Sequence, residues 1–183
     1  MARALLIIDF QNDFTAGGAL AVPDGDAIAG RVTELIDSGD FDLVVATRDW
    51  HPPNHGSFRD QGGPWPPHCV QGTHGAELHD SLDRDAVDVV VDAGYEPGLE
   101  GYSGFEETDL AQALRSHDVE EVTVVGLATD YCVKETALDA VRLRFDTVVL
   151  GELVRAVELQ PGDGERALEA MRAAGARVEQ QPA

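Results

Sequence analysis

The residue best suited to nucleophilic chemistry is Cys132, which lies in the segment Gly126 to Val133. A run of valines precedes this segment and is typical of a buried strand. Apolar residues at helical spacing follow, so we expect a helix to begin near Tyr131, with Thr129 or Asp130 as its N-cap. Free N–H groups and the helix dipole stabilise a thiolate in the first turn of a helix. The alternative is a small buried hydrophobic residue, as most free cysteines are.

Asp9 is a second candidate, because it ends the continuous apolar run Ala4 to Ile8. Such a run is typical of a central parallel strand. Ligand sites in open α/β sheets lie at the carboxyl ends of the strands, which is where Asp9 is expected. The alternative is an aspartate that caps a loop.

A third group combines one aspartate with histidines. Asp49 and His51 are two residues apart at the end of an expected strand, so both can point into one site if the chain stays extended. His68 follows in a long loop rich in glycine and proline. One carboxylate and two imidazoles form a sensible ligand set for a divalent metal. The alternative is surface histidines in a proline-rich loop, although loops of this length are more often functional.

Composition limits the class of protein. The chain has 183 residues, a length that suits one domain, and its net charge of −21 argues against nucleic acid or an anionic membrane as a partner. There is no apolar run of membrane-spanning length and no signal-peptide pattern. Two cysteines are too few for a disulfide framework. We therefore expect a cytoplasmic protein with a single domain over residues 1–183.

Strand-like and helix-like segments alternate along the chain, which predicts an α/β fold with a mainly parallel sheet covered on both faces. Strands are expected near 4–8, 43–46, 87–91, 122–125, 146–150 and 176–178. Helices are expected over 28–36, 109–116 and 131–145 and through 167–171.

Five segments together resemble the nicotinamidase (pyrazinamidase) branch of the isochorismatase-like cysteine hydrolases. They are residues 7–14, 48–58, 65–70, 101–106 and 126–133, in the order and at the spacing typical of that family. Each segment is modestly specific, and the set is highly specific. The resemblance implies a six-stranded parallel sheet between helices, which agrees with the pattern of alternating elements.

The resemblance also implies roles for individual residues. Asp9 falls on the acid/base aspartate, Cys132 on the nucleophile, and the N–H groups of Ala128 and Cys132 on the oxyanion hole, after a cis peptide between Leu127 and Ala128. The metal ligands implied are Asp49, His51 and His68, with His55 and Ser57 as weaker candidates. The substrate pocket implied consists of Phe14, Leu20, Trp65, Tyr102, Leu127 and Tyr131; ordinary core packing is the alternative for the aromatic residues.

The sequence departs from the family at one position. The family's catalytic lysine lies nine residues before the tyrosine of Tyr-Ser-Gly-Phe, which here is Ala93, and a shift by one residue reaches Asp92. The single lysine of the chain, Lys134, follows Cys132 and is best explained as a solvated helix charge. Natural divergence, an arginine from elsewhere, or a deliberate Lys→Ala change each explain the loss; the intact motifs favour the last.

The implied activity is hydrolysis of a small aromatic amide, nicotinamide or pyrazinamide, with one divalent metal ion. Zinc, iron and manganese all suit the ligands, with zinc favoured. Without the lysine we expect impaired turnover. The alternatives are a related amide hydrolase of the N-carbamoyl type and a homologue that binds metal and ligand without catalysis. A homo-oligomer is compatible with the sequence.

Overall fold

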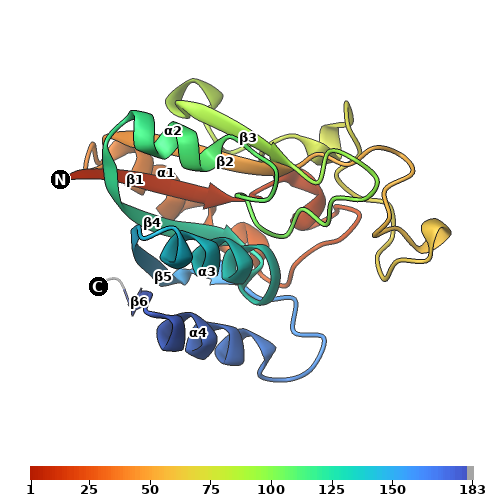
Figure 1. The fold of residues 1–183 in the computed structure, drawn as a ribbon. Coiled ribbons are helices and arrows are strands. Elements are labelled where there is room, and N and C mark those ends of the chain that lie inside the picture. Colours follow the sequence, from red (N-terminus) through yellow and green to blue (C-terminus); the bar gives the residue numbers. More distant parts are fainter. Residues whose placement is uncertain (181–183) are drawn as a thin grey trace.

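The computed structural model describes residues 1–180, which contain one six-stranded sheet whose neighbouring strands all run parallel. The strand order is β3-β2-β1-β4-β5-β6 (Figure 1). The strands are β1 (Ala2–Ile8), β2 (Leu43–Asp49), β3 (Val89–Ala93), β4 (Val119–Leu127), β5 (Asp146–Arg155) and β6 (Arg177–Glu179). This confirms the predicted fold class.

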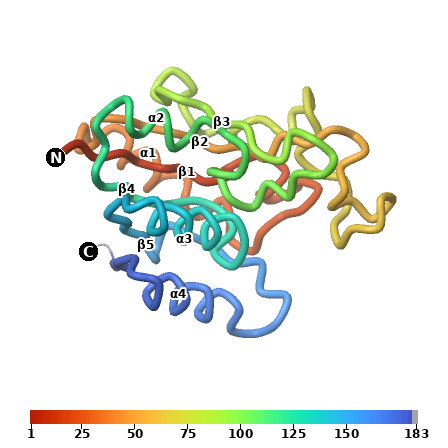
Figure 2. The backbone as a smooth tube through the Cα atoms, in the orientation of Figure 1, coloured from red at the N-terminus to blue at the C-terminus, as the bar shows by residue number. Residues whose placement is uncertain are grey.

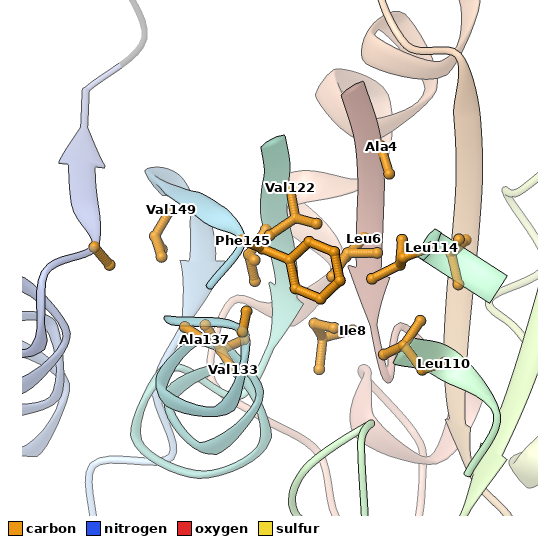
Figure 3. Close-up of a cluster of buried hydrophobic side chains, with 14 of the residues drawn as sticks. Ala4, Leu6, Ile8, Leu110, Leu114, Val122, Val133, Ala137, Phe145 and Val149 are labelled. Carbon is orange, nitrogen blue, oxygen red and sulfur yellow. The ribbon is translucent and has the colours of Figure 1, made fainter. Parts of the chain in front are cut away.

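Four α-helices within the described residues cover the two faces of the sheet. They are α1 (Ala29–Asp37), α2 (Leu110–Ser116), α3 (Lys134–Arg142) and α4 (Asp163–Ala174). Helices α2, α3 and α4 pack on one face of the sheet. The core cluster on this face contains Leu6 and Ile8 of β1, together with Leu110, Leu114, Val133 and Ala137 (Figure 3). Helix α1 covers the other face, where Ile28 and Val32 join the core cluster that contains Leu5 and Ile7. Alternate residues of β1 therefore enter opposite cores, as the pleat of a strand requires.

The topology determines where a ligand can bind. Strands β2 and β3 lie on one side of β1, and β4 to β6 lie on the other, so the order reverses between β1 and β4. A crevice outside the carboxyl ends of the strands forms at such a switch point. The connections that follow β1, β2, β3 and β4 gather at that end of the sheet, opposite the N-terminus (Figure 2).

The connection between β2 and β3 is the longest and carries no α-helix. It contains three short 3₁₀ turns, Arg59–Gln61, His74–Ala76 and Arg84–Ala86. An isolated bridge between Gln11 and Leu78 attaches it to the loop after β1, and a bridge between His51 and Val70 joins its first residues to its middle part. These bridges fix the loop that contains the predicted histidines against the end of the sheet. No helix of the described residues is long and apolar enough to cross a membrane.

The boundaries differ from the sequence prediction mainly around Cys132. A π-helical turn, Thr129–Val133, follows β4, and α3 begins only at Lys134. Asp130 does not cap this helix, because its carboxylate accepts the N–H groups of Val157 and Glu158. The expected N-cap was therefore wrong: a long-range contact with the chain after β5 replaces the local hydrogen bond. A single domain over 1–183 remains a prediction, and residues 181–183 lie outside the described residues.

Candidate active site

Four consecutive parallel strands each deliver a site residue at the carboxyl end. Asp9 follows β1, Asp49 ends β2, Ala93 ends β3, and Cys132 lies in the turn after β4. Strands β1 and β4 approach so closely beside Asp9 that a Cβ at Gly126 would lie 2.1 Å from the carbonyl oxygen of Ile8. Only glycine fits there, where φ is +119°. This close approach brings Asp9 and Cys132 to one place.

Asp9 is buried and has a left-handed backbone conformation, with φ of 44°. Thr47 of β2 holds it at two points: the Thr47 hydroxyl donates to Asp9 Oδ1 at 2.7 Å, and the Asp9 N–H donates to that hydroxyl at 3.1 Å. Burial and the charge of Asp49 raise the pKa of Asp9 well above its ordinary value, against the opposing effects of Cys132, Thr47 and His51. A carboxyl group with a raised pKa is suited to accept and return a proton.

Cys132 is also buried, and its sulfur lies near the carboxylates of Asp9 and Asp49, with one ligand atom from each of the three residues within 4.8 Å of the others. Burial, followed by the charges of Asp9 and Asp49, raises the pKa of Cys132 well above its ordinary value. The expected thiolate stabilisation was therefore wrong for the chain by itself. Burial and the two carboxylates together favour the protonated sulfur, so a base has to remove its proton.

The predicted metal ligands Asp49, His51 and His68 lie together, with one donor atom from each within 4.8 Å of the others. Asp49 Oδ2 is 3.3 Å from Nε2 of His51 and 3.8 Å from Nε2 of His68. The other ring nitrogens are held by main-chain carbonyls: Nδ1 of His51 donates to Gly94 at 2.8 Å and Nδ1 of His68 donates to Pro66 at 2.8 Å. Such contacts orient metal-binding imidazoles with Nε2 directed inward.

The charge states of this group suit a cation. Burial lowers the pKa of His51 and of His68, so both imidazoles are neutral near pH 7 and can act as ligands. Burial raises the pKa of Asp49 to about 7, and its Oδ1 is a buried oxygen with no hydrogen-bond partner among the described residues. An unpartnered buried carboxylate oxygen beside two neutral imidazoles is the arrangement expected where a divalent cation completes the site.

His55 and Ser57, the weaker ligand candidates, are close to this group but differently engaged. Both ring nitrogens of His55 have partners, because Nδ1 meets the Ser57 hydroxyl at 2.7 Å and Nε2 meets the carbonyl oxygen of Leu99 at 2.6 Å. The ring of His55 stacks on that of His51, with centroids 3.8 Å apart. The ring of His55 thus packs against the ring of His51, while Ser57 lines the adjoining cavity.

The geometry distinguishes the two positions considered for the missing lysine. Ala93 is buried and pairs in register with Asp49, whereas Asp92 points away and forms a two-point ion pair with Arg48. Gly94 follows with φ of +62°, and a Cβ there would lie 2.6 Å from the His51 ring. Ala93 is thus the residue of β3 that adjoins the group, and Asp92 does not face it.

A narrow cavity of about 40 Å³ opens beside Cys132 and the Asp49–His51–His68 group. Trp65 donates to the Tyr102 hydroxyl at 3.1 Å, and the ring of Tyr131 lies edge-on to Trp65 at 5.3 Å. The predicted pocket residues found in its lining are Phe14, Leu20, Trp65, Tyr102 and Tyr131, together with Ala128. No lysine or arginine is among the lining residues within 1–180, so the structure brings no arginine to replace the lysine.

One predicted pocket residue is placed differently. Leu127 is fully buried and packs in the core cluster with Phe10 and Val125, so its side chain does not line the cavity. The peptide bond between Leu127 and Ala128 is cis, and Ala128 is the one of the two that reaches the lining. Both residues belong to the same core cluster, but Ala128 follows the end of β4 and lies next to the turn that carries Cys132.

Sequence reasoning missed several residues around the site. Val22, Glu100 and Val157 line the cavity, and no local pattern marks them, because they come from three connections that are distant in the sequence. Gln11 was also missed, although it lies inside one of the resemblance segments. Its buried side-chain amide donates to the Asp49 carbonyl at 2.8 Å and accepts the Asp49 N–H at 2.9 Å. A polar side chain two residues after Asp9 was the one feature of the sequence that could have indicated Gln11.

The comparisons with known proteins agree with this site. Residues 3–182 match the isochorismatase domain family. A nicotinamidase of Escherichia coli (strain K12) is 44% identical, with 96% of this chain and 93% of that protein covered. The crystal structure of a pyrazinamidase of Pyrococcus horikoshii in complex with zinc has a TM-score of 0.90 at 49% identity, covering 98% of this chain and 99% of that one.

A third comparison extends the similarity to a complex with a small aromatic acid. The crystal structure of PnC1 from L. infantum in complex with nicotinate has a TM-score of 0.93 at 38% identity and covers 98% of this chain and 92% of that one. The family match spans nearly the whole sequence, and the relatives share the fold throughout. The chain therefore belongs to the isochorismatase family, within its nicotinamidase and pyrazinamidase branch.

Proposed function

We propose that this chain is a cysteine amidohydrolase that converts nicotinamide to nicotinate and ammonia, with pyrazinamide as a second substrate. The observation that carries the proposal is the placement of Cys132 beside Asp9, at the mouth of an aromatic cavity and next to the group Asp49, His51 and His68. A flat heteroaromatic amide suits a narrow cavity of this kind, since apolar walls bind its ring and a few polar groups orient its amide.

The reaction follows from the charge states of two residues. Asp9 removes the proton from Cys132, whose sulfur then attacks the amide carbon. The N–H groups of Ala128 and Cys132 stabilise the oxyanion that forms. Asp9 then gives its proton to the leaving nitrogen, and ammonia departs from a thioester on Cys132. A water molecule, deprotonated by Asp9, cleaves this thioester to release the acid and restore the thiol.

We propose that Asp49, His51 and His68 hold one divalent metal ion, with zinc favoured over iron and manganese. The fit rests on the inward-facing Nε2 atoms and on Oδ2 of Asp49, which lies 3.3 Å from Nε2 of His51 and 3.8 Å from Nε2 of His68. An ion held by these residues would supply Lewis-acid chemistry towards a ring nitrogen of the substrate. His55 stays a supporting residue in this scheme, because both of its ring nitrogens are engaged.

We further propose that turnover is impaired because Ala93 occupies the position of the family's lysine. A cation between Asp9 and Cys132 favours the ionised forms of both, and this chain supplies none from the lining of its cavity within 1–180. Positioned proton-transfer groups typically contribute about 10²–10⁴-fold in rate, so the impairment is expected in that range. We also propose a cytoplasmic location, which is consistent with two free cysteines.

The test is product formation by the protein loaded with one equivalent of zinc, with nicotinate measured by chromatography and ammonia by a coupled assay. Nicotinamide should yield equal amounts of both products, and Cys132→Ala should abolish their formation. The matched control is Cys69→Ala, since Cys69 is also buried but has no proposed part in the reaction. Faster hydrolysis of an N-carbamoyl substrate than of nicotinamide would instead identify the chain as an amide hydrolase of the N-carbamoyl type. Tight nicotinamide binding without products, even after a lysine is restored at position 93, would identify a non-catalytic binding protein.

A further inference from the structure

A second group of potential metal ligands lies beside the first. One ligand atom each of Asp9, Asp49 and Cys132 lies within 4.8 Å of the other two, and all three residues are buried. Asp49 belongs to both groups, with Oδ2 facing the imidazoles of His51 and His68. The two groups therefore share one carboxylate, as neighbouring metal sites commonly do in two-metal centres.

The distances suit a bound ion. Zinc–sulfur bonds are about 2.3 Å and zinc–oxygen bonds about 2.0–2.2 Å, so tetrahedral ligand atoms lie about 3.3–3.8 Å apart. The ligand atoms of the three residues lie within 4.8 Å of one another, which is about 1 Å beyond the upper end of that range. Thr47 limits the rotation of Asp9 through Oδ1, which leaves Oδ2 as the oxygen able to coordinate.

A separate observation points to a cation at this place. Oδ1 of Asp49 is buried and has no hydrogen-bond partner among the described residues, and the Asp49 side chain is only 7% exposed. Because Oδ2 faces the imidazoles, Oδ1 remains for a second ion. An unpartnered buried carboxylate oxygen costs free energy, and a bound cation removes that cost.

The ionisable side chains of the second group carry no positive charge. Two carboxylates and one thiol face each other, and no lysine or arginine lines the adjoining cavity within residues 1–180. Arg48, the arginine of β2, forms ion pairs with Asp92 and Glu77. Lys134 lies against Glu135 and borders hollows outside that cavity. The small side chain of Ala93 ends β3 beside this group without adding a charge.

We propose that Asp9, Asp49 and Cys132 form a second, thiolate-containing site for a borderline-soft divalent ion such as zinc or cobalt, in place of a side-chain ammonium. On binding, the S–H bond of Cys132 breaks, a sulfur–metal bond forms, and the proton passes to the solvent. Because the ion occupies the nucleophilic sulfur, the second equivalent of metal inhibits turnover. This site is distinct from the Asp49–His51–His68 group and does not depend on which amide the chain hydrolyses.

The experiment adds Co²⁺ to protein that already carries one equivalent of zinc. Cobalt binds protein ligands less tightly than zinc, so it does not readily displace the first ion. We expect about one further equivalent of Co²⁺ to bind, with a near-ultraviolet thiolate-to-cobalt charge-transfer band. Cys132→Ala should abolish the band, whereas Cys69→Ala should retain it, since Cys69 is the other buried thiol and lies outside the group.

A second variant tests the link to position 93. Ala93→Lys should bind the first zinc ion as before but weaken cobalt binding at the second site by at least tenfold, because an ammonium group then occupies it. The proposal is overturned if no second equivalent binds, if the band survives Cys132→Ala, or if Ala93→Lys leaves cobalt binding unchanged. These readouts need no substrate, so a failure here is distinguishable from a failure of the proposed amidase activity.

Discussion

Asp49 is the residue on which most of the site depends, and its position is set by Gln11. The amide of Gln11 makes two hydrogen bonds to the main chain of Asp49 and a third, at 2.8 Å, to the carbonyl of Ala76. This fully buried side chain joins the loop after β1, the end of β2 and the loop before β3. It fixes the carboxylate of Asp49 without touching it.

Gln11→Ala should therefore weaken both stability and metal binding. The change leaves buried main-chain groups of Asp49 and Ala76 without partners, and such a group costs about 1–3 kcal/mol. We expect the free energy of unfolding to fall by about 2–3 kcal/mol in urea titrations, with weaker zinc binding by the folded protein. Gln160→Ala, at an exposed position, is the control and should change little. Equal effects of the two substitutions would contradict this role of Gln11.

At the residue scale, the sequence was informative where a residue type itself carries the chemistry. Asp9, Asp49, His51, His68 and Cys132 were predicted, and the structure places them together, although their roles remain proposals. The raised pKa of Cys132 could not be predicted, because it depends first on burial and then on two carboxylates delivered by other strands. Burial and neighbouring charge are properties of the fold, and local spacing does not show them.

At the element scale, an ion-pair network fastens three strands at the end of the sheet opposite the site. Glu121 of β4 accepts from Arg3 of β1 at 2.8 Å and from Arg177 of β6 at 2.8 Å. Burial alone would raise the pKa of Glu121, but the hydrogen bonds from the two arginines outweigh it and lower the pKa below its ordinary value. The ionised carboxylate is therefore the form that stabilises the fold.

The pH dependence follows from the sign of this shift. A lowered folded-state pKa gives a contribution that is complete above the unfolded pKa, about 4.3, and is lost as pH falls through the folded value. Because the arginines are about half exposed, we expect Glu121→Gln to cost about 1 kcal/mol at pH 7. The difference should shrink in urea unfolding as pH falls below the unfolded pKa of about 4.3. A cost that is independent of pH would contradict the charge-based explanation. Glu34→Gln, in an exposed helix pair, is the control.

The sequence predicted which elements exist better than where they end. Apolar runs identified all six strands, but β2 extends to Asp49 and β5 to Arg155 because pairing with neighbouring strands continues beyond the apolar segment. The π-helical turn before α3 was not predicted, since helical spacing of apolar residues does not distinguish a widened turn from a regular one. Strand order likewise depends on contacts between distant segments.

At the scale of the whole molecule, the surface carries a large excess of negative charge. Acidic residues number 34 and basic ones 13, which gives the net charge of −21. Repulsion among like charges destabilises a compact state, and salt screens it, since the Debye length falls from about 10 Å at 0.1 M to about 3 Å at 1 M. Salt should therefore stabilise this fold through general screening, apart from any particular ion pair.

We expect the thermal unfolding midpoint to rise by several degrees between about 0.1 and 1 M sodium chloride. A matched variant replaces four exposed acids by their amides, at Asp37, Asp60, Glu96 and Glu120, which changes the net charge from −21 to −17. Its unfolding midpoint should rise less with salt. Calorimetry of both proteins at the two salt concentrations measures the effect. An unchanged or lowered midpoint, or the same response in both proteins, would show that charge repulsion does not limit stability.

The central claim is that Asp9 and Cys132 form the catalytic pair of a nicotinamidase whose cation is missing at position 93. The most direct test compares ammonia release from nicotinamide by the chain and by Ala93→Lys, each loaded with one equivalent of zinc, with Lys134→Ala as a control outside the cavity. We predict that Ala93→Lys raises the rate about 10²–10⁴-fold, and that Lys134→Ala leaves it unchanged. Equal rates for the chain and Ala93→Lys, or no ammonia from either while zinc is bound, would contradict the account.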